Sequence, residues 1–226
     1  MFKIDINHED CFKAMETLES KSIDCIITDP PYGMDFKSNY RKEKYNKMDN
    51  DKNIDWLPSF LDECDRVLKN NSHFYMFCSF HHLDTFMIEV KKRFDLKNII
   101  VWEKNNTSMG DLEGNYAPKY ELILFIQKGR RLLNGTRKSN IVKYAITENK
   151  YHPTEKPLEL IRYLLRNSTN KEERVLDPFM GSGTTAVACK ELNRYFIGYE
   201  INREYFLTAE TRLRNVNESL MLFTKN

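Results

Sequence analysis

The chain has 226 residues, a formal net charge of +2 and a pI of about 8.2, with 41% hydrophobic and 30% charged residues. This composition is typical of a globular protein, and so small a net charge does not by itself indicate a nucleic-acid or membrane partner. The sequence shows neither a signal peptide nor an apolar run long enough to span a bilayer. We therefore expect a cytoplasmic protein without a membrane partner, in which residues 1–226 form a single domain.

Cysteine usage indicates a reducing compartment and no metal site. The five cysteines are odd in number and scattered: Cys11, Cys25, Cys64, Cys78 and Cys189. Their spacing is not that of metal ligands, and the pair His81-His82 lacks cysteine or carboxylate partners at ligand spacing. Most of the cysteines fall in apolar periodic segments, which predicts small core residues.

Strand-like and helix-like apolar patterns alternate along the chain. Strands are predicted at residues 2–6, 23–27, 74–77, 99–102, 122–126, 175–177 and 195–200. Helices are predicted at residues 10–18, 56–68, 83–94, 157–165, 184–192 and 202–216. This alternation predicts an α/β fold with a mostly parallel central sheet and helices on both faces.

The strand at residues 23–27 is apolar throughout, which is typical of a strand buried on both faces, and it ends on Asp29-Pro30-Pro31-Tyr32. The two prolines lack backbone donors and prevent the chain from extending the strand or starting a helix. A carboxylate, free carbonyls and an aromatic ring at such a turn suit a flat molecule that carries an amino group. An ordinary strand-ending turn is the alternative.

A second strand-to-turn junction carries two glycines, Gly181 and Gly183, which let the backbone approach a ligand closely. The next predicted strand ends at Glu200, where an acid can hold ribose hydroxyls. Residues 181–186 also match a dinucleotide fingerprint, so an NAD-linked oxidoreductase is a rival interpretation. Only 26 residues follow Glu200, too few for a second mononucleotide-binding half, and the acidic pair Asp177 and Glu200 suits a cationic ligand better than a pyrophosphate.

Two basic segments interrupt the pattern. Residues 36–53 are predicted to form a mobile loop that contains Arg41, Lys42 and Lys44. Residues 128–150 contain Lys128, Arg130, Arg131, Arg137, Lys138 and Lys143, with no acid between them. Positive charge of such local density predicts contact with nucleic-acid phosphates, and a solvated surface is the alternative.

Taken together, these motifs resemble those of the amino-group DNA methyltransferases of the β class, in which the catalytic motif precedes the cofactor motif. Asp29–Tyr32 resembles the catalytic motif, residues 177–185 resemble the S-adenosylmethionine loop, and residues 152–157 resemble the segment beside the methionine moiety. Residues 198–200 resemble the ribose-binding strand. Asp10 matches an acid on the adenine side, although Glu9 stands where the family commonly has glycine. The resemblance covers nearly the whole chain and implies a Rossmann-like fold with a circularly permuted motif order.

The resemblance also implies roles for individual residues. The catalytic residues would be Asp29, Pro30, Pro31 and Tyr32. The cofactor would bind Asp10, Cys11, Asp29, His152, Thr154, Lys156, Asp177, Phe179, Gly181, Ser182, Gly183, Thr184, Thr185 and Glu200. DNA would bind Arg41, Lys42, Lys44, Arg130, Arg131, Arg137 and Lys138, and residues 128–150 would form a short target-recognition segment.

The expected activity is methyl transfer from S-adenosylmethionine to N6 of a flipped adenine in a specific DNA site. A cytosine-N4 enzyme is less expected, because that specificity more often has serine at position 29. A cofactor-binding subunit without activity is a further alternative. The expected partner is DNA, and the family leaves open a restriction endonuclease partner and a homodimer.

Overall fold

The computed structural model describes residues 3–31, 54–107, 113–147, 151 and 154–223. The strands are β1 (Ile4–Asn7), β2 (Ile23–Thr28), β3 (Leu68–Cys78), β4 (Asp95–Glu103), β5 (Tyr120–Lys128), β6 (Ile141–Lys143), β7 (Arg174–Asp177) and β8 (Tyr195–Tyr199). The helices are α1 (Cys11–Glu16), α2 (Leu57–Val67), α3 (Leu83–Lys91), α4 (Leu158–Ser168), α5 (Thr184–Glu191) and α6 (Arg203–Phe223), with a 3-10 turn at Phe80–His82.

The strands form one eight-stranded sheet in the order β1-β8-β7-β2-β3-β5-β4-β6. Strand β5 is antiparallel to both of its neighbours, β3 and β4, and the other pairings are parallel. All strands except β5 therefore end at the same edge of the sheet, which we call the carboxyl edge. The opposite edge, where β5 ends, is the amino edge. The predicted α/β fold with a mostly parallel sheet is confirmed.

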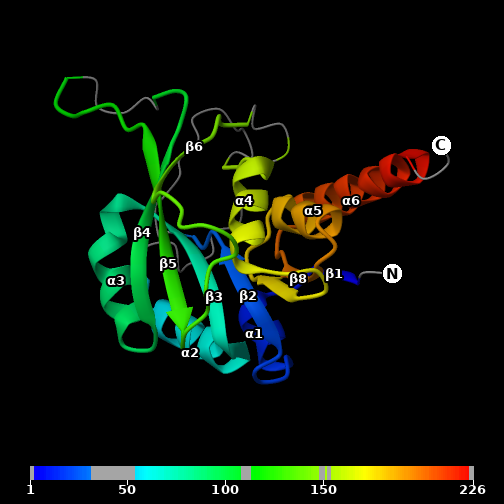
Figure 1. Ribbon diagram of the computed structural model, residues 1–226, viewed down its shortest axis with the longest axis horizontal. Coiled ribbons are helices and arrows are strands. Elements are labelled where there is room, and N and C mark those ends of the chain that lie inside the picture. Colours follow the sequence, from blue (N-terminus) through cyan, green and yellow to red (C-terminus); the bar gives the residue numbers. More distant parts are fainter. Residues whose placement is uncertain (1–2, 32–53, 108–112, 148–150, 152–153, 224–226) are drawn as a thin grey trace.

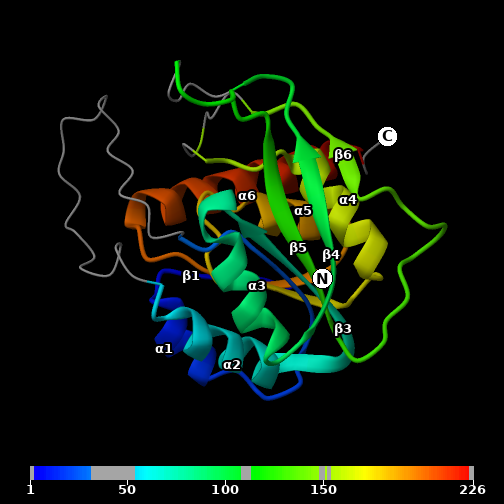
Figure 2. The ribbon, with the colours of Figure 1, turned by 90° about the vertical axis from the view of Figure 1, so that its left-hand side faces the viewer.

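Helices cover both faces of the sheet, as predicted (Figures 1 and 2). Helices α1, α2 and α3 pack on one face, and α4, α5 and α6 pack on the other. Strand β2 contributes to both cores, because Ile26 faces the first set of helices while Cys25 and Ile27 face the second. All six residues of β2 are buried, which confirms the prediction of a strand buried on both faces.

The structure differs from the prediction most in β3 and β6. Strand β3 begins at Leu68, directly after α2, whereas the apolar pattern begins only at Phe74, because residues 69–71 are exposed and the buried residues Ser72 and His73 are polar. Strand β6 was not predicted. It is an outermost strand of the sheet, next to β4, and only Val142 is buried, so its three residues carry no periodic signal.

All five cysteines are free and buried, as predicted from their apolar neighbourhoods. Within the described ranges, no group of three or more His, Cys, Asp and Glu side chains is arranged to hold a metal ion. Among the same residues, none of the helices combines the length and the apolar character that crossing a membrane requires.

Candidate active site

Two neighbouring strands at the centre of the sheet lead into carboxylates at the carboxyl edge. Asp177 is the last residue of β7, and Asp29 directly follows β2. The helix after β7 is α5, on one face of the sheet, whereas the next described helix after β2 is α2, on the other face. Such a reversal is a topological switch point, and open α/β sheets bind ligands in the crevice outside it. The structure thus brings the two predicted motifs together where this architecture binds ligands.

The Asp29 side chain is largely buried and forms an ion pair with a lysine from a distant part of the chain. Lys156 Nζ donates to Asp29 Oδ2 at 2.5 Å, and the same ammonium lies 3.2 Å from Glu121 Oε2. Pro30 is buried and Pro31 is exposed. Tyr32 lies outside the described residues, so its predicted stacking on a base stays a prediction.

The turn between β7 and α5 contains both predicted glycines in the left-handed region, with φ of 52° at Gly181 and 81° at Gly183. A Cβ on Gly183 would lie 2.7 Å from Cβ of Ala209 in α6. Helix packing, and not only the approach of a ligand, therefore requires glycine at position 183.

The Asp177 carboxylate accepts hydrogen bonds from this turn and from α5. Its Oδ2 accepts a hydrogen bond from Thr185 Oγ1 at 2.7 Å, and its Oδ1 accepts one from the Phe179 amide at 3.2 Å. Burial raises the pKa of Asp177 to about 7, although both hydrogen bonds oppose this shift. A cationic ligand in the crevice would stabilise the charged carboxylate.

An arginine of α6 joins the glycine turn to the segment before α4. Arg212 Nη1 donates to Ser182 O, Ser182 Oγ and Thr184 Oγ1 at 3.0, 3.0 and 3.1 Å. Its Nη2 lies 3.0 Å from Glu155 Oε1, and its guanidinium carbon lies 4.6 Å from the centre of the Tyr151 ring. The hydroxyls of Ser182 and Thr184, predicted to contact the cofactor, thus face Arg212. The sequence analysis missed Glu155, because nothing in its local pattern indicates a partner that lies in α6.

The Glu200 carboxylate organises the backbone at the end of β8. Its Oε2 accepts a hydrogen bond from the Gly181 amide at 2.9 Å, and its Oε1 accepts one from the Asn202 amide at 2.7 Å. Burial raises the pKa of Glu200, while these amides oppose the shift. Each carboxylate oxygen has a second lone pair, so the predicted bond to a ribose hydroxyl remains available.

Asp10 and Cys11 lie at the start of α1, and Thr154 lies before α4. Asp10 Oδ1 caps α1 by accepting a hydrogen bond from the Phe12 amide at 2.9 Å. Cys11 is buried, and burial raises the pKa of its thiol. Thr154 is exposed in the segment before α4, whereas His152 lies outside the described residues.

Four of the predicted DNA-contact residues lie in the described part of the chain, between β5 and β6: Arg130, Arg131, Arg137 and Lys138. Because β5 runs against the other strands, the chain leaves it at the amino edge, and Arg130 and Arg131 follow there, away from Asp29. Arg131 Nη2 lies 2.6 Å from Glu173 Oε2. Arg137 and Lys138 are exposed and precede β6. DNA contact by these residues stays a prediction, and the structure favours a structural role for Arg131. Arg41, Lys42 and Lys44 lie outside the described residues.

We expect Arg131→Ala to lower the free energy of unfolding by about 1–3 kcal/mol, because the Glu173 carboxylate loses its charged partner and keeps the Asn170 amide. The salt dependence of DNA binding should not change. Urea denaturation and DNA titrations at several salt concentrations test both expectations, and Arg130→Ala, at an exposed position, is the matched control for the stability measurement. A salt slope reduced by about 1 at unchanged stability would instead assign Arg131 to a phosphate.

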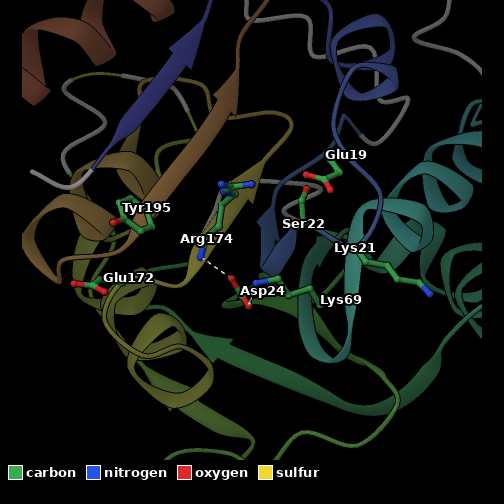
Figure 3. A pocket seen from close by; sticks show the side chains of 8 residues that line it. All are labelled: Glu19, Lys21, Ser22, Asp24, Lys69, Glu172, Arg174 and Tyr195. Atoms are coloured by element: carbon green, nitrogen blue, oxygen red, sulfur yellow. Dashed lines mark hydrogen bonds and ion pairs between the residues drawn. The ribbon is translucent and has the colours of Figure 1, made fainter.

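A pocket of about 330 Å³ lies at the amino edge, at the start of β2 (Figure 3). It is lined by Glu19, Lys21, Ser22, Asp24, Lys69, Glu172, Arg174 and Tyr195. Asp24 accepts hydrogen bonds from Lys69 Nζ at 2.7 Å and from the Arg174 amide at 2.9 Å, which joins the starts of three neighbouring strands. The pocket is lined by three acidic and three basic side chains, so their charges balance. We therefore assign this pocket a structural role, separate from the candidate active site.

Comparison with known proteins identifies the family. A family model described as DNA methylase matches residues 23–211, which include Asp29 and Glu200. The type II methyltransferase M.HpaI of Haemophilus parainfluenzae is 34% identical, over 89% of this chain and 71% of M.HpaI. The DNA adenine methyltransferase YhdJ of Escherichia coli K12 is 30% identical, over 92% of this chain and 82% of YhdJ.

A solved structure shares both sequence and fold with this protein. The crystal structure of the M1.HpyAVI–SAM complex is 31% identical, with a TM-score of 0.71 over 92% of this chain and 99% of that chain. This likeness confirms the predicted Rossmann-like methyltransferase fold. Together with the matched family model, it shows that the chain belongs to the DNA methylase family, the N6/N4 amino-methyltransferases of DNA.

Proposed function

We propose that this protein transfers the methyl group of S-adenosylmethionine to N6 of a flipped adenine at a specific site in DNA, as a β-class enzyme. The observation that carries the proposal is the position of Asp29 beside the Asp177 turn at the topological switch point. In support, the relative YhdJ is named a DNA adenine methyltransferase, and M1.HpyAVI was crystallised with SAM. The catalytic motif precedes the cofactor motif in the sequence, which is the β-class order.

S-adenosylmethionine supplies an electrophilic methyl group on a positively charged sulfonium. The residues of this chain that fit such a ligand are the buried carboxylate of Asp177, the partly buried carboxylate of Glu200, and a turn whose glycines adopt positive φ. The proposed cofactor residues are Asp10, Cys11, Asp29, His152, Thr154, Lys156, Asp177, Phe179, Gly181, Ser182, Gly183, Thr184, Thr185 and Glu200. Within this set, the contacts described above favour an indirect role for Ser182 and Thr184, through the turn that Arg212 holds, and for Lys156, through its ion pair with Asp29.

Asp29 and the Pro30 carbonyl can accept the two hydrogens of the adenine amino group. This group is a poor nucleophile, because its lone pair is delocalised into the ring. Hydrogen bonds to both hydrogens draw the nitrogen toward tetrahedral geometry and stabilise the positive charge that develops during attack. Stacking of Tyr32 on the flipped base would contribute about 1–3 kcal/mol, against a cost of a few kcal/mol for removing the base from the duplex.

Residues 36–53 begin four positions after Tyr32 in the sequence and lie outside the described residues. We include Arg41, Lys42 and Lys44 of this segment, together with Arg130, Arg137 and Lys138, among the residues that contact phosphates. Residues 128–150 remain the proposed target-recognition segment within a single domain of residues 1–226. A restriction endonuclease partner and a homodimer belong to the same proposal, the first because M.HpaI is named a type II methyltransferase.

Mass spectrometry of nucleosides tests the proposed base. DNA incubated with the protein and S-adenosylmethionine is digested and compared with DNA incubated without the cofactor. We expect N6-methyldeoxyadenosine as the product, because Asp29 and Pro30 suit an exocyclic amino group and the family resemblance selects adenine. N4-methyldeoxycytidine as the main product would contradict the proposal. Modification-sensitive sequencing of the same DNA then identifies the site.

A further inference from the structure

Four side chains of alternating charge line the carboxyl edge next to the candidate active site. Lys156 Nζ lies 2.5 Å from Asp29 Oδ2 and 3.2 Å from Glu121 Oε2. Glu121 Oε1 in turn lies 2.6 Å from Nζ of Lys104, the residue after β4. Lys156 therefore bridges the carboxylate that follows β2 and a carboxylate of β5. We call Asp29, Lys156 and Glu121 the Lys156 bridge.

The hydrogen bonds of Lys156 are directed within the protein. An ammonium has three N–H donors. In addition to the two carboxylates, the Thr154 carbonyl lies 3.4 Å from Lys156 Nζ. The side chain is only 10% exposed, and its ammonium lies 5.0 Å from the centre of the Phe77 ring. Three oxygens and an aromatic face thus surround the group, which argues against the cofactor contact that the family resemblance implies.

We propose that Lys156 is a positioning residue that acts through Asp29: it holds the carboxylate ionised and in one orientation for the amino group of the target base. This inference rests on the proposed function. A carboxylate offers about four acceptor positions, so Asp29 can bind Lys156 and the amino group at the same time. The gain is preorganisation, since the carboxylate need not reorient when the base arrives.

Glu121 makes the buried ammonium stable in this position. A buried ion pair is costly unless its charges are fully compensated, and Glu121 with Lys104 extends the pair into a neutral set of four charges. Burial lowers the pKa of Lys156, but Asp29 and Glu121 more than offset this and raise it above its usual range. Burial raises the pKa of Glu121, but Lys156 and Lys104 more than offset this and lower it.

In the part of the chain that the structure describes, the other titratable groups around Asp29 do not supply a cation. Asp177 of β7 contributes a carboxylate whose pKa is raised by burial and also by Asp29. Cys78 of β3 contributes a neutral thiol, because burial raises its pKa to about 12. Among the described residues, Lys156 is the cation that contacts Asp29. Its removal should therefore raise the pKa of Asp29 by about 1–3 units.

The test compares Lys156→Met with Lys156→Arg by single-turnover methylation across pH and by calorimetric titration with S-adenosylmethionine. In Lys156→Met we expect the acid limb of the rate profile to move up by about 1–3 pH units, with a loss of about 100-fold at low pH. Cofactor affinity should stay within about twofold. Lys156→Arg, which keeps the charge, should recover most of the rate. Lys119→Met removes an exposed lysine at the same edge, paired with Glu103, and is the matched control.

Two results would overturn the inference. Cofactor affinity weakened tenfold at an unchanged saturated rate would make Lys156 a cofactor ligand. An equal loss at every pH would make its role structural only. Should Lys156→Met fail to fold, Glu121→Gln provides the test. This substitution removes the second carboxylate that pairs with Lys156, so Asp29 should ionise at lower pH and the acid limb of the rate profile should move down. An unchanged acid limb would contradict the inference.

A measurement without methyl transfer separates this inference from the proposed function. The ¹³C resonance of the Asp29 carboxylate, assigned with Asp29→Asn, reports its pKa directly. A higher pKa of Asp29 in Lys156→Met supports the bridge whatever base is methylated. An unchanged pKa contradicts it even if the protein methylates adenine.

Discussion

We expect Asp29→Ala to lower the rate of methyl transfer by about 1,000-fold or more, while the protein stays folded. The substitution removes the group that accepts a hydrogen bond from the amino nitrogen and stabilises the charge developing there. It also leaves the buried ammonium of Lys156 with Glu121 as its remaining carboxylate. Single-turnover methylation at saturating cofactor isolates the chemical step, and circular dichroism with urea denaturation checks the fold.

Asp29→Asn is the matched variant, because it keeps the size of the side chain and one acceptor oxygen but removes the charge. We expect it to retain more activity than Asp29→Ala and to remain far below the wild type. Tyr32→Phe keeps the stacking face and should keep its methylation activity, whereas Tyr32→Ala should lose much of that activity. Full activity in Asp29→Ala would remove this carboxylate from the mechanism and with it the basis of the proposed function.

We expect Asp177→Asn to change the pH dependence of stability and to weaken cofactor binding. The pKa of Asp177 is raised by burial from 3.8 to about 7. Below about pH 4 the carboxyl is protonated in both the folded and the unfolded state, so its ionisation does not lower the free energy of unfolding. Between about pH 4 and pH 7 the folded state binds more protons, so the contribution of Asp177 to stability falls as the pH rises. At about 1.4 kcal/mol per pKa unit, the cost above pH 7 reaches up to about 4 kcal/mol.

The neutral amide introduced by Asp177→Asn avoids this cost, so the variant should gain stability relative to the wild type as the pH rises from about 4 to 8. Urea denaturation across that range measures the difference. Cofactor affinity should fall at least tenfold, because the amide cannot stabilise a positively charged ligand. The wild type should also release about half a proton per cofactor at pH 7, and the variant none. Calorimetry in buffers of different ionisation enthalpy measures that release, and no difference between the two proteins would contradict the assignment.

Local sequence patterns determined most of the fold and located the site. The continuous apolar run of β2 and the two prolines after Asp29 were sufficient to predict a buried strand that ends at a turn. The glycines at 181 and 183 predicted the turn before α5, where both adopt positive φ. Hydrophobic periodicity and backbone restriction act over a few residues, which is why both features can be recognised without a structure.

Only the tertiary structure decided which side chains meet. The direction of β5 places Arg131 at the amino edge with Glu173, and no local pattern specifies whether a strand joins a sheet parallel or antiparallel. Lys156 contacts Asp29, which is 127 positions away in sequence. Ion pairs of this kind depend on how distant strands and loops converge at one edge of a sheet. The sequence by itself therefore determined the two carboxylate turns and their ligand class, and the packing of the sheet decided the partners that set the charge and orientation of those carboxylates.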